Sequence, residues 1–136
     1  MSAIDLGHEL GPRSRATPRP DQIAAYVSAA DIAEPMFTDP ARARALGYRG
    51  VVVPGPVLAA FLGQFARAEL PGWRIERLST TFRVPTISGD VLVLRGVVTE
   101  HHAAPDGEYV VCDLLIEHAG GERAVTGTAT LRRAAA

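Results

Sequence analysis

The stretch from Gly50 to Leu70, GVVVPGPVLAAFLGQFARAEL, decides the fold that the sequence predicts. It begins with three valines (51–53), an apolar run typical of a strand, and continues through a Pro-Gly-Pro turn. Pro56 suits the first position of a helix because it needs no N–H donor there and its φ is already helical. From Val57 to Phe65 nearly every side chain is small or apolar. We therefore predict a central helix that is buried on all sides.

A first, shorter helix is predicted over residues 18–30. Thr17 is the expected N-cap and Pro18 the first helical residue. The apolar face of this helix would consist of Ile23, Tyr26 and Val27. Residues 1–17 before it form a weakly patterned N-terminal arm, to which no element is assigned.

A second short helix is predicted between the first helix and the central one. Asp39 would be its N-cap, Pro40 would begin it, and Gly47 would mark its end. The intervening residues 31–38 should be irregular, because Pro35 disfavours the helical conformation at the residue before it.

After Gly72 the sequence changes to two-residue periodicity, in four runs up to Leu131. Turn signals separate the runs at residues 89–90, 106–107 and 120–121. The residues expected on one face of the sheet are Leu78, Thr80, Phe82 and Val84, then Leu92, Leu94 and Val98, then Val110, Cys112, Leu114 and Ile116, and finally Val125, Gly127, Ala129 and Leu131. These patterns predict an α+β domain with an antiparallel sheet and one buried helix.

Composition narrows the class of protein. A chain of 136 residues suffices for one domain with a real core, and 47% hydrophobic with 21% charged residues is ordinary for a soluble protein. The net charge of −1 gives no reason to expect a nucleic acid or a membrane as partner. The single Cys112 excludes an internal disulfide or a cysteine metal cluster. With no signal peptide recognised in the polar, Pro-rich residues 1–19, we predict a cytoplasmic protein.

Few side chains in the sequence could carry chemistry. His101, His102 and His118 match no common zinc spacing and are expected to be solvated turn residues, so no metal site is predicted. The carboxylates Asp31 and Glu34 lie shortly before the central helix and could act as acid or base. Asp31 could equally cap the end of the first helix or lie in solvent.

Gly55 is the one backbone feature of the sequence that could take part in catalysis. Amide groups at a helix start are unsatisfied and carry partial positive charge, so they can polarise a thioester carbonyl. A tight entry turn with no chemical role explains the glycine equally well.

Three segments give the chain a resemblance to a known family. They are DPARARALGYRGVVVPGPVLAAF (39–61), TTFRVPTISGDVLVLRGVVTE (80–100) and GERAVTGTATL (121–131). Together they resemble the MaoC-like hydratase/dehydratase family of hotdog proteins over nearly the whole chain. The resemblance implies one hotdog domain over residues 1–136, with an antiparallel sheet wrapped around the central helix. It implies hydration or dehydration of (3R)-hydroxyacyl thioesters carried on CoA or acyl carrier protein, and no cofactor is predicted.

The family's catalytic Asp and His, spaced as in D-x-N-P-x-H, are not matched. Aligning Pro35 with the motif proline puts Glu34 at the Asn position, Phe37 at the His position and Ile32 at the Asp position. A one-residue insertion would restore Asp31 to the Asp position. Phenylalanine cannot give or take a proton, so the usual acid/base pair is missing.

Three functions remain open from the sequence. The chain could be an active lyase that uses Asp31 or Glu34 in an altered site. It also resembles the non-catalytic partner of heterodimeric (3R)-hydroxyacyl-ACP dehydratases, which shapes the acyl pocket while the other subunit supplies the dyad. A third possibility is a hotdog recruited to thioester hydrolysis or to cyclisation in natural-product biosynthesis.

The resemblance also implies the walls of an acyl pocket and an oligomer. Beside Phe37, the candidate substrate-binding residues are Tyr48, Pro54, Gly55 and Val57, with Pro54 replacing the family's usual His. A homodimer or a heterodimer with another hotdog subunit is expected, because a single hotdog leaves a sheet edge and one side of the pocket uncovered.

Overall fold

The computed structural model describes residues 4–135. One five-stranded sheet and one long helix make up most of it. The elements are, in chain order, β1 (Glu9–Ala16), α1 (Pro20–Ala29), the 3-10 turn η1 (Pro35–Phe37), α2 (Pro40–Ala45), α3 (Gly55–Glu69), β2 (Arg74–Phe82), β3 (Val91–Ala104), β4 (Gly107–His118) and β5 (Arg123–Ala134).

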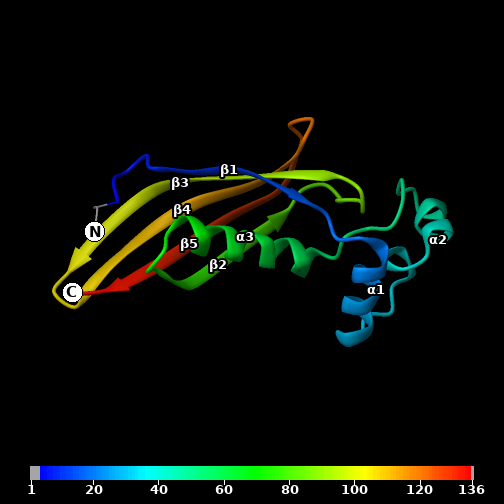
Figure 1. Cartoon of the computed structure of the whole chain (residues 1–136), viewed down its shortest axis with the longest axis horizontal. Coiled ribbons are helices and arrows are strands. Elements are labelled where there is room, and N and C mark those ends of the chain that lie inside the picture. The colour runs from blue at the N-terminus through cyan, green and yellow to red at the C-terminus, as the bar shows by residue number, and fades with distance from the viewer. Residues whose placement is uncertain (1–3, 136) are drawn as a thin grey trace.

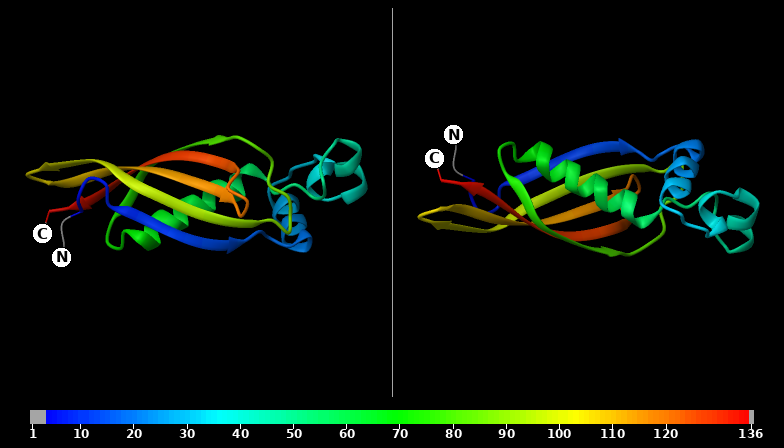
Figure 2. Two further views of the ribbon diagram at one scale, coloured as in Figure 1. Left: turned by 90° about the horizontal axis from the view of Figure 1, so that it is seen from above. Right: turned by 90° about the horizontal axis from the view of Figure 1, so that it is seen from below.

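The sheet is antiparallel throughout and has the strand order β1-β3-β4-β5-β2. Its strands arch over α3, which lies along one face, and the opposite face carries no helix (Figures 1 and 2). The segment with α1, η1 and α2 projects beyond the end of the sheet at which α3 begins. The predicted α+β architecture, with an antiparallel sheet and a central helix, is confirmed.

The core lies between α3 and the sheet. The helix contributes residues at positions three and four apart, which lie on one helical face. These are Leu58, Phe61, Leu62, Phe65 and Ala66. The sheet contributes alternate residues, and those predicted on β3, β4 and β5 lie on the helix side; all of them except Gly127 belong to the buried core. At Gly127 an added Cβ would lie 3.4 Å from the Leu62 side chain and 3.0 Å from the Ser79 carbonyl oxygen, so a small residue permits close packing.

The prediction that α3 is buried on all sides is wrong for the single chain. One face of the helix is exposed, and it is formed by Pro56, Ala60, Gln64, Arg67 and Ala68. The sheet covers only the opposite face, because it arches over the helix without closing around it. Small apolar residues made the exposed face look like core in the sequence.

The N-terminal region differs from its prediction in two ways. Residues 9–16, which received no element, form β1 and pair with β3 at the edge of the sheet. The first helix begins at Pro20 with Arg19 as N-cap, not at Pro18 with Thr17. The Thr17 hydroxyl instead accepts a hydrogen bond of 2.8 Å from the Gly89 backbone N–H.

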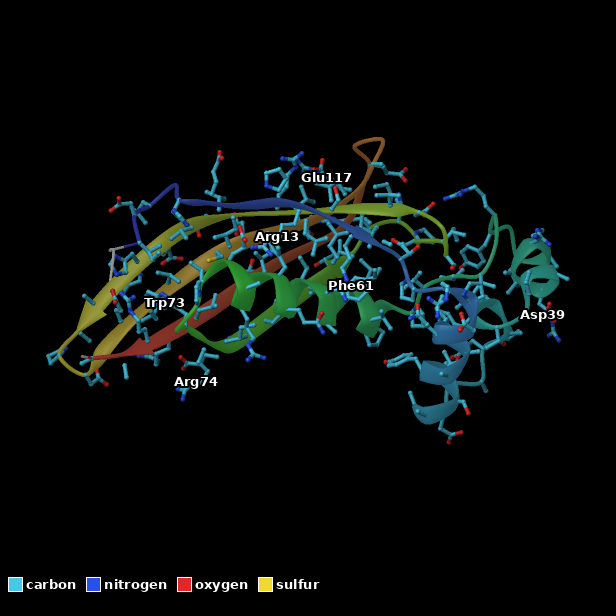
Figure 3. All side chains as sticks on the ribbon, viewed as in Figure 1. Arg13, Asp39, Phe61, Trp73, Arg74 and Glu117 are labelled. Atoms are coloured by element: carbon cyan, nitrogen blue, oxygen red, sulfur yellow. The ribbon has the colours of Figure 1, made fainter. Side chains whose placement is uncertain are left out.

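The second helix follows the sequence prediction. The Asp39 carboxylate accepts hydrogen bonds from the N–H groups of Ala41 and Arg42, at 3.0 and 3.2 Å. Gly47 follows the last turn with a φ of 96°, as expected for the residue that ends a helix. Asp39 lies in the projecting segment, well away from Phe61 on α3 (Figure 3).

None of the helices in residues 4–135 has the length and apolar character needed to span a bilayer.

Candidate functional site

The start of α3 is held between two other segments. The valines 51–53 form a short extended run that enters the helix, as predicted. On one side, Val53 N–H donates to the Thr86 carbonyl and Ser88 N–H to the Val51 carbonyl, both at 2.8 Å. On the other side, Val52 N–H donates to the Met36 carbonyl in η1 at 3.0 Å. The helix start, η1 and the loop before β3 therefore form one connected unit.

Gly55 lies at the first position of α3, after the fully buried Pro54. The Gly55 N–H donates to no group within residues 4–135, whereas Val57 N–H bonds back to the Pro54 carbonyl at 3.1 Å. An added Cβ on Gly55 would come within 2.9 Å of the Phe82 ring, so a larger residue here would force this ring to shift. The helix thus presents a free amide at its positive end.

The two residues that the sequence alignment predicts at the family's Asp and His positions, Ile32 and Phe37, are apolar. Ile32 and Phe37 are half-buried, and both pack against the main hydrophobic cluster. Val57 is half-buried against the same cluster. The predicted pocket residues Phe37, Pro54, Gly55 and Val57 thus belong to the connected unit at the helix start.

Asp31 ends the first helix. Its φ of 55° is left-handed, and the bonds from Asp31 N–H to Ser28 O and from Ile32 N–H to Val27 O close the last turn. This is the pattern of a Schellman motif, in which Gly is preferred and Asn or Asp tolerated. The alternative that Asp31 caps helix one is therefore confirmed for its backbone, while its carboxylate is exposed.

Glu34 and Tyr48 occupy the edges of the projecting segment. Glu34 is exposed and precedes η1, where its carbonyl accepts from Phe37 N–H at 3.4 Å. Neither the Glu34 nor the Asp31 carboxylate bonds to another group of the described residues. Tyr48 is half-buried after α2, and its N–H donates to the Ala43 carbonyl at 3.0 Å. No hydrogen bond joins it to Phe37 or Gly55 within residues 4–135.

The expectation of solvated histidines is wrong for His118, whose side chain is only 12% exposed. Its Nδ1 lies 3.0 Å from Glu122 Oε1, and its Nε2 lies 3.0 Å from the hydroxyl of the buried Thr86. Asp90 Oδ2 lies 3.8 Å from the same Nε2. The partners Thr86 and Asp90 come from a loop distant in sequence, so spacing along the chain could not reveal this cluster.

His101 is also not a turn residue. It lies within β3, opposite Val110 of β4, and its Nε2 is 2.6 Å from Glu108 Oε2. Arg133 bonds to the other oxygen of the same carboxylate. The Arg133 guanidinium, and after it His101, lower the pKa of Glu108.

A groove of about 580 Å³ lies on the sheet face opposite α3. Hydroxyl groups of Ser79, Thr81, Thr126 and Thr128 line it. Figure 3 shows Glu117 on this outer face, where it pairs with Arg95 at 2.6 Å. No predicted site residue contributes to the groove, so it is separate from the unit at the helix start.

Within residues 4–135, no cluster of three or more His, Cys, Asp or Glu side chains is arranged to bind a metal ion.

Comparisons with known proteins agree with this fold. The family described as "FAS1-like, dehydratase domain region" matches residues 5–127. No curated protein matches the chain. Among solved structures, the (R)-hydratase from A. caviae involved in PHA biosynthesis is 24% identical, with a TM-score of 0.83 over 98% of this chain and 99% of that one.

Two further structures share the architecture at low identity. A MaoC-like dehydratase from Rhodospirillum rubrum is 21% identical, with a TM-score of 0.84 over 98% of this chain and 94% of that one. The HadBC (3R-hydroxyacyl-ACP dehydratase) complex from Mycobacterium tuberculosis is 21% identical, with a TM-score of 0.74 over 93% and 96%. The family match and the shared fold lead to one conclusion: the chain belongs to the FAS1-like dehydratase-domain family and has the hotdog fold of these structures.

Proposed function

We propose that this chain is a pocket-forming subunit of a (3R)-hydroxyacyl-thioester dehydratase or hydratase, and that a partner hotdog subunit supplies the acid and base. One observation carries the proposal. Ile32 and Phe37, which the sequence alignment predicts at the family's Asp and His positions, are apolar and pack against the core. A site built in this way can hold an acyl chain but cannot move a proton.

The contribution of this chain would be to bind and polarise the substrate. The free Gly55 amide at the positive end of α3 would donate to the thioester carbonyl, where negative charge develops when the α-carbon gains or loses a proton. Phe37 and Val57 would line the acyl chain, with Pro54 and Tyr48 as further walls. In hydration, water adds its hydroxyl to the β-carbon and a proton to the α-carbon, and dehydration reverses both steps. The partner would mediate both proton transfers.

The partner would be a second hotdog chain that keeps the Asp/His pair. The neighbours include two structures described as complexes, HadBC and ChsH1-ChsH2 from Mycobacterium tuberculosis. The exposed face of α3 leaves apolar surface for a partner to cover. CoA and acyl carrier protein as carriers, and a cytoplasmic location, stay predictions from the sequence.

A second candidate is a chain that is active alone through Asp31 or Glu34. It is favoured by the exposure of both carboxylates on the segment that leads from α1 into η1. The absence of an orienting partner within the described residues weighs against it, because an acid/base group must be held within reach of its proton.

Restoring the dyad tests the proposal. We expect the double variant Ile32→Asp/Phe37→His to hydrate crotonyl-CoA at least about a hundredfold faster than the wild-type chain, because positioned acid/base groups contribute this much or more. The single variant Phe37→His should gain far less. Circular dichroism and thermal unfolding would show that each variant is folded.

Two further variants separate the candidates. Asp31→Asn and Glu34→Gln, introduced into the dyad-restored chain, should leave its activity unchanged, and Asn still accepts the left-handed backbone at position 31. A folded double variant without gain of activity would contradict a substrate pocket built around these positions.

A further inference from the structure

His118 joins two parts of the molecule that lie far apart in sequence. The loop before β3 and the turn between β4 and β5 lie at the same end of the molecule as the start of α3 (Figures 1 and 2). His118 stands at the end of β4, and its side chain lies between Glu122 of the turn and Thr86 of the loop. Its backbone N–H also donates to the Glu122 carbonyl at 2.8 Å.

The neutral imidazole can satisfy both of its ring nitrogens and the Thr86 hydroxyl within this cluster. A carboxylate can only accept, so Nδ1–H donates to Glu122 Oε1 at 3.0 Å. In the neutral ring Nε2 then accepts, and the Thr86 hydroxyl donates to it at 3.0 Å. Thr86 is 1% exposed, and no buried side-chain oxygen or nitrogen of the described residues lacks a partner.

Thr86 also connects the loop before β3 to the start of α3. Its carbonyl accepts the Val53 N–H at 2.8 Å, and Val53 lies two residues before Gly55. The loop is restrained further by Asp90, whose Oδ2 accepts from Ile87 N–H at 2.9 Å and whose carboxylate also pairs with Arg49. The position of the Gly55 amide thus depends on the loop before β3, which is hydrogen-bonded through Thr86 to the His118 imidazole.

We infer that His118 is a positioning residue, which holds the start of α3 in place through its hydrogen bond to Thr86. The hydrogen bond is directional and partly buried, so it sets the loop against the Val51–Val53 segment more sharply than apolar packing alone. The functional consequence, a correctly placed Gly55 amide, rests on the proposed function. The structural consequence, a fixed position of the loop against the Val51–Val53 segment, does not depend on the proposed function.

Two substitutions at His118 keep different halves of the ring's hydrogen bonding. A glutamine can place its amide oxygen near the position of Nε2 and accept from Thr86, whereas an asparagine reaches only the position of Nδ1. His118→Gln should therefore preserve the restraint and His118→Asn should remove it. Thr86→Val removes the same bond from the other side, and Thr86→Ser keeps the hydroxyl.

Hydrogen exchange of the Val53 amide, followed by NMR, tests the inference. We expect exchange about tenfold faster in His118→Asn and Thr86→Val than in the wild type, the size of one lost hydrogen bond. His118→Gln and Thr86→Ser should stay within about threefold of the wild type. The Val98 amide, which donates to the His8 carbonyl at 2.9 Å, serves as reference and should not change.

Three results would overturn the inference. These are unchanged Val53 exchange in His118→Asn, equal acceleration at Val53 and Val98, and failure of His118→Gln to restore slow exchange. If His118→Asn does not fold, Thr86→Val against Thr86→Ser decides the question. Because no substrate is needed, a wild-type chain that hydrates crotonyl-CoA by itself would contradict the proposed function and leave this result standing.

Discussion

Asp31 and Gly47 occupy the same backbone position at the ends of two helices. Each follows the C-cap with a positive φ, 55° and 96°, and each helix closes with a bond from the next residue's N–H to a carbonyl of the last turn. In this conformation the Cβ of an L-residue crowds its own carbonyl oxygen. Gly47 was predictable because glycine signals a helix end, whereas Asp31 carries no such signal.

Substitutions at Asp31 separate its backbone role from any chemical role of its carboxylate. We expect Asp31→Gly to raise the free energy of unfolding by about 1 kcal/mol and Asp31→Val to lower it by at least as much, because the left-handed conformation penalises a Cβ, above all a branched one. Urea denaturation followed by circular dichroism measures both. A loss of stability in Asp31→Gly would show that the carboxylate itself stabilises the fold.

The thiol of Cys112 is buried in the core, and burial raises its pKa to about 11. We expect no reaction with a thiol-specific disulfide reagent at mildly alkaline pH, since the thiolate is the reactive form, and fast reaction after unfolding in urea. Cys112 is the only cysteine in the sequence. The coloured thiolate that the disulfide reagent releases on reaction therefore measures the reactivity of this site alone. Equal rates for folded and unfolded protein would contradict the burial.

The raised pKa of the Cys112 thiol also makes the free energy of unfolding depend on pH. An unfolded thiol loses its proton near pH 8.5, whereas the folded one keeps it up to about 11, so the unfolded state binds fewer protons between these values. The stability contributed by the neutral thiol is therefore complete below about pH 8.5 and decreases as the pH rises through this window. Urea midpoints of the wild type should fall more steeply there than those of Cys112→Ala.

At the level of elements, α3 has two faces that the sequence did not distinguish. Leu62 is fully buried against β5, whereas Ala60 and Gln64 face outward. The proline at its start and the run of apolar residues predict the helix correctly, but small residues on both faces hide which face meets the sheet.

Matched leucine truncations test which side chains stabilise the fold. Leu62→Ala should lower the free energy of unfolding by about 2–5 kcal/mol, through lost burial and a cavity. Leu46→Ala, at a leucine that is 60% exposed, should change it by less than about 0.5 kcal/mol. Chemical denaturation of both variants gives the comparison, and similar effects would contradict the position of α3 against the sheet.

The strands show where sequence reasoning succeeds and where it fails. Alternation predicted β3, β4 and β5 with their inward residues, and Asp106-Gly107 predicted the hairpin between β3 and β4. The strand β1 was missed because only Leu10 is buried in it and a register shift after Leu10 interrupts the alternation. The His118 cluster was missed because the hydrogen bond between His118 and Thr86 spans 32 residues and only the tertiary fold brings the two side chains together.

At the level of the whole molecule, the single chain leaves surfaces that a partner would cover. The outward face of α3 is rich in small apolar residues, and β1 and β2 are open sheet edges. Phe82, at the end of β2, is 50% exposed beside Gly55. The hotdog fold could be predicted from the family resemblance, whereas the choice of partner depends on surfaces that local patterns do not encode.

We expect the purified chain to self-associate through these surfaces when its partner is absent. Light scattering should then give a mass above the 14.4 kDa of one chain. Ala60→Glu places a charge on the exposed face of α3 and should shift the mass toward that of one chain, with an unchanged circular dichroism spectrum. A wild-type chain that is monomeric at all concentrations would contradict a role for this face in self-association.

The most direct test of the proposed function is an enoyl-thioester hydration assay on the purified chain alone. The loss of crotonyl-CoA is followed by ultraviolet absorbance, for the wild type, Asp31→Asn and Glu34→Gln in parallel. If the acid and base belong to a partner subunit, all three proteins fold and none hydrates the substrate above the uncatalysed rate. Turnover by the wild-type chain that is lost in Asp31→Asn or Glu34→Gln would contradict this and identify the chain as a lyase with its own displaced acid/base group.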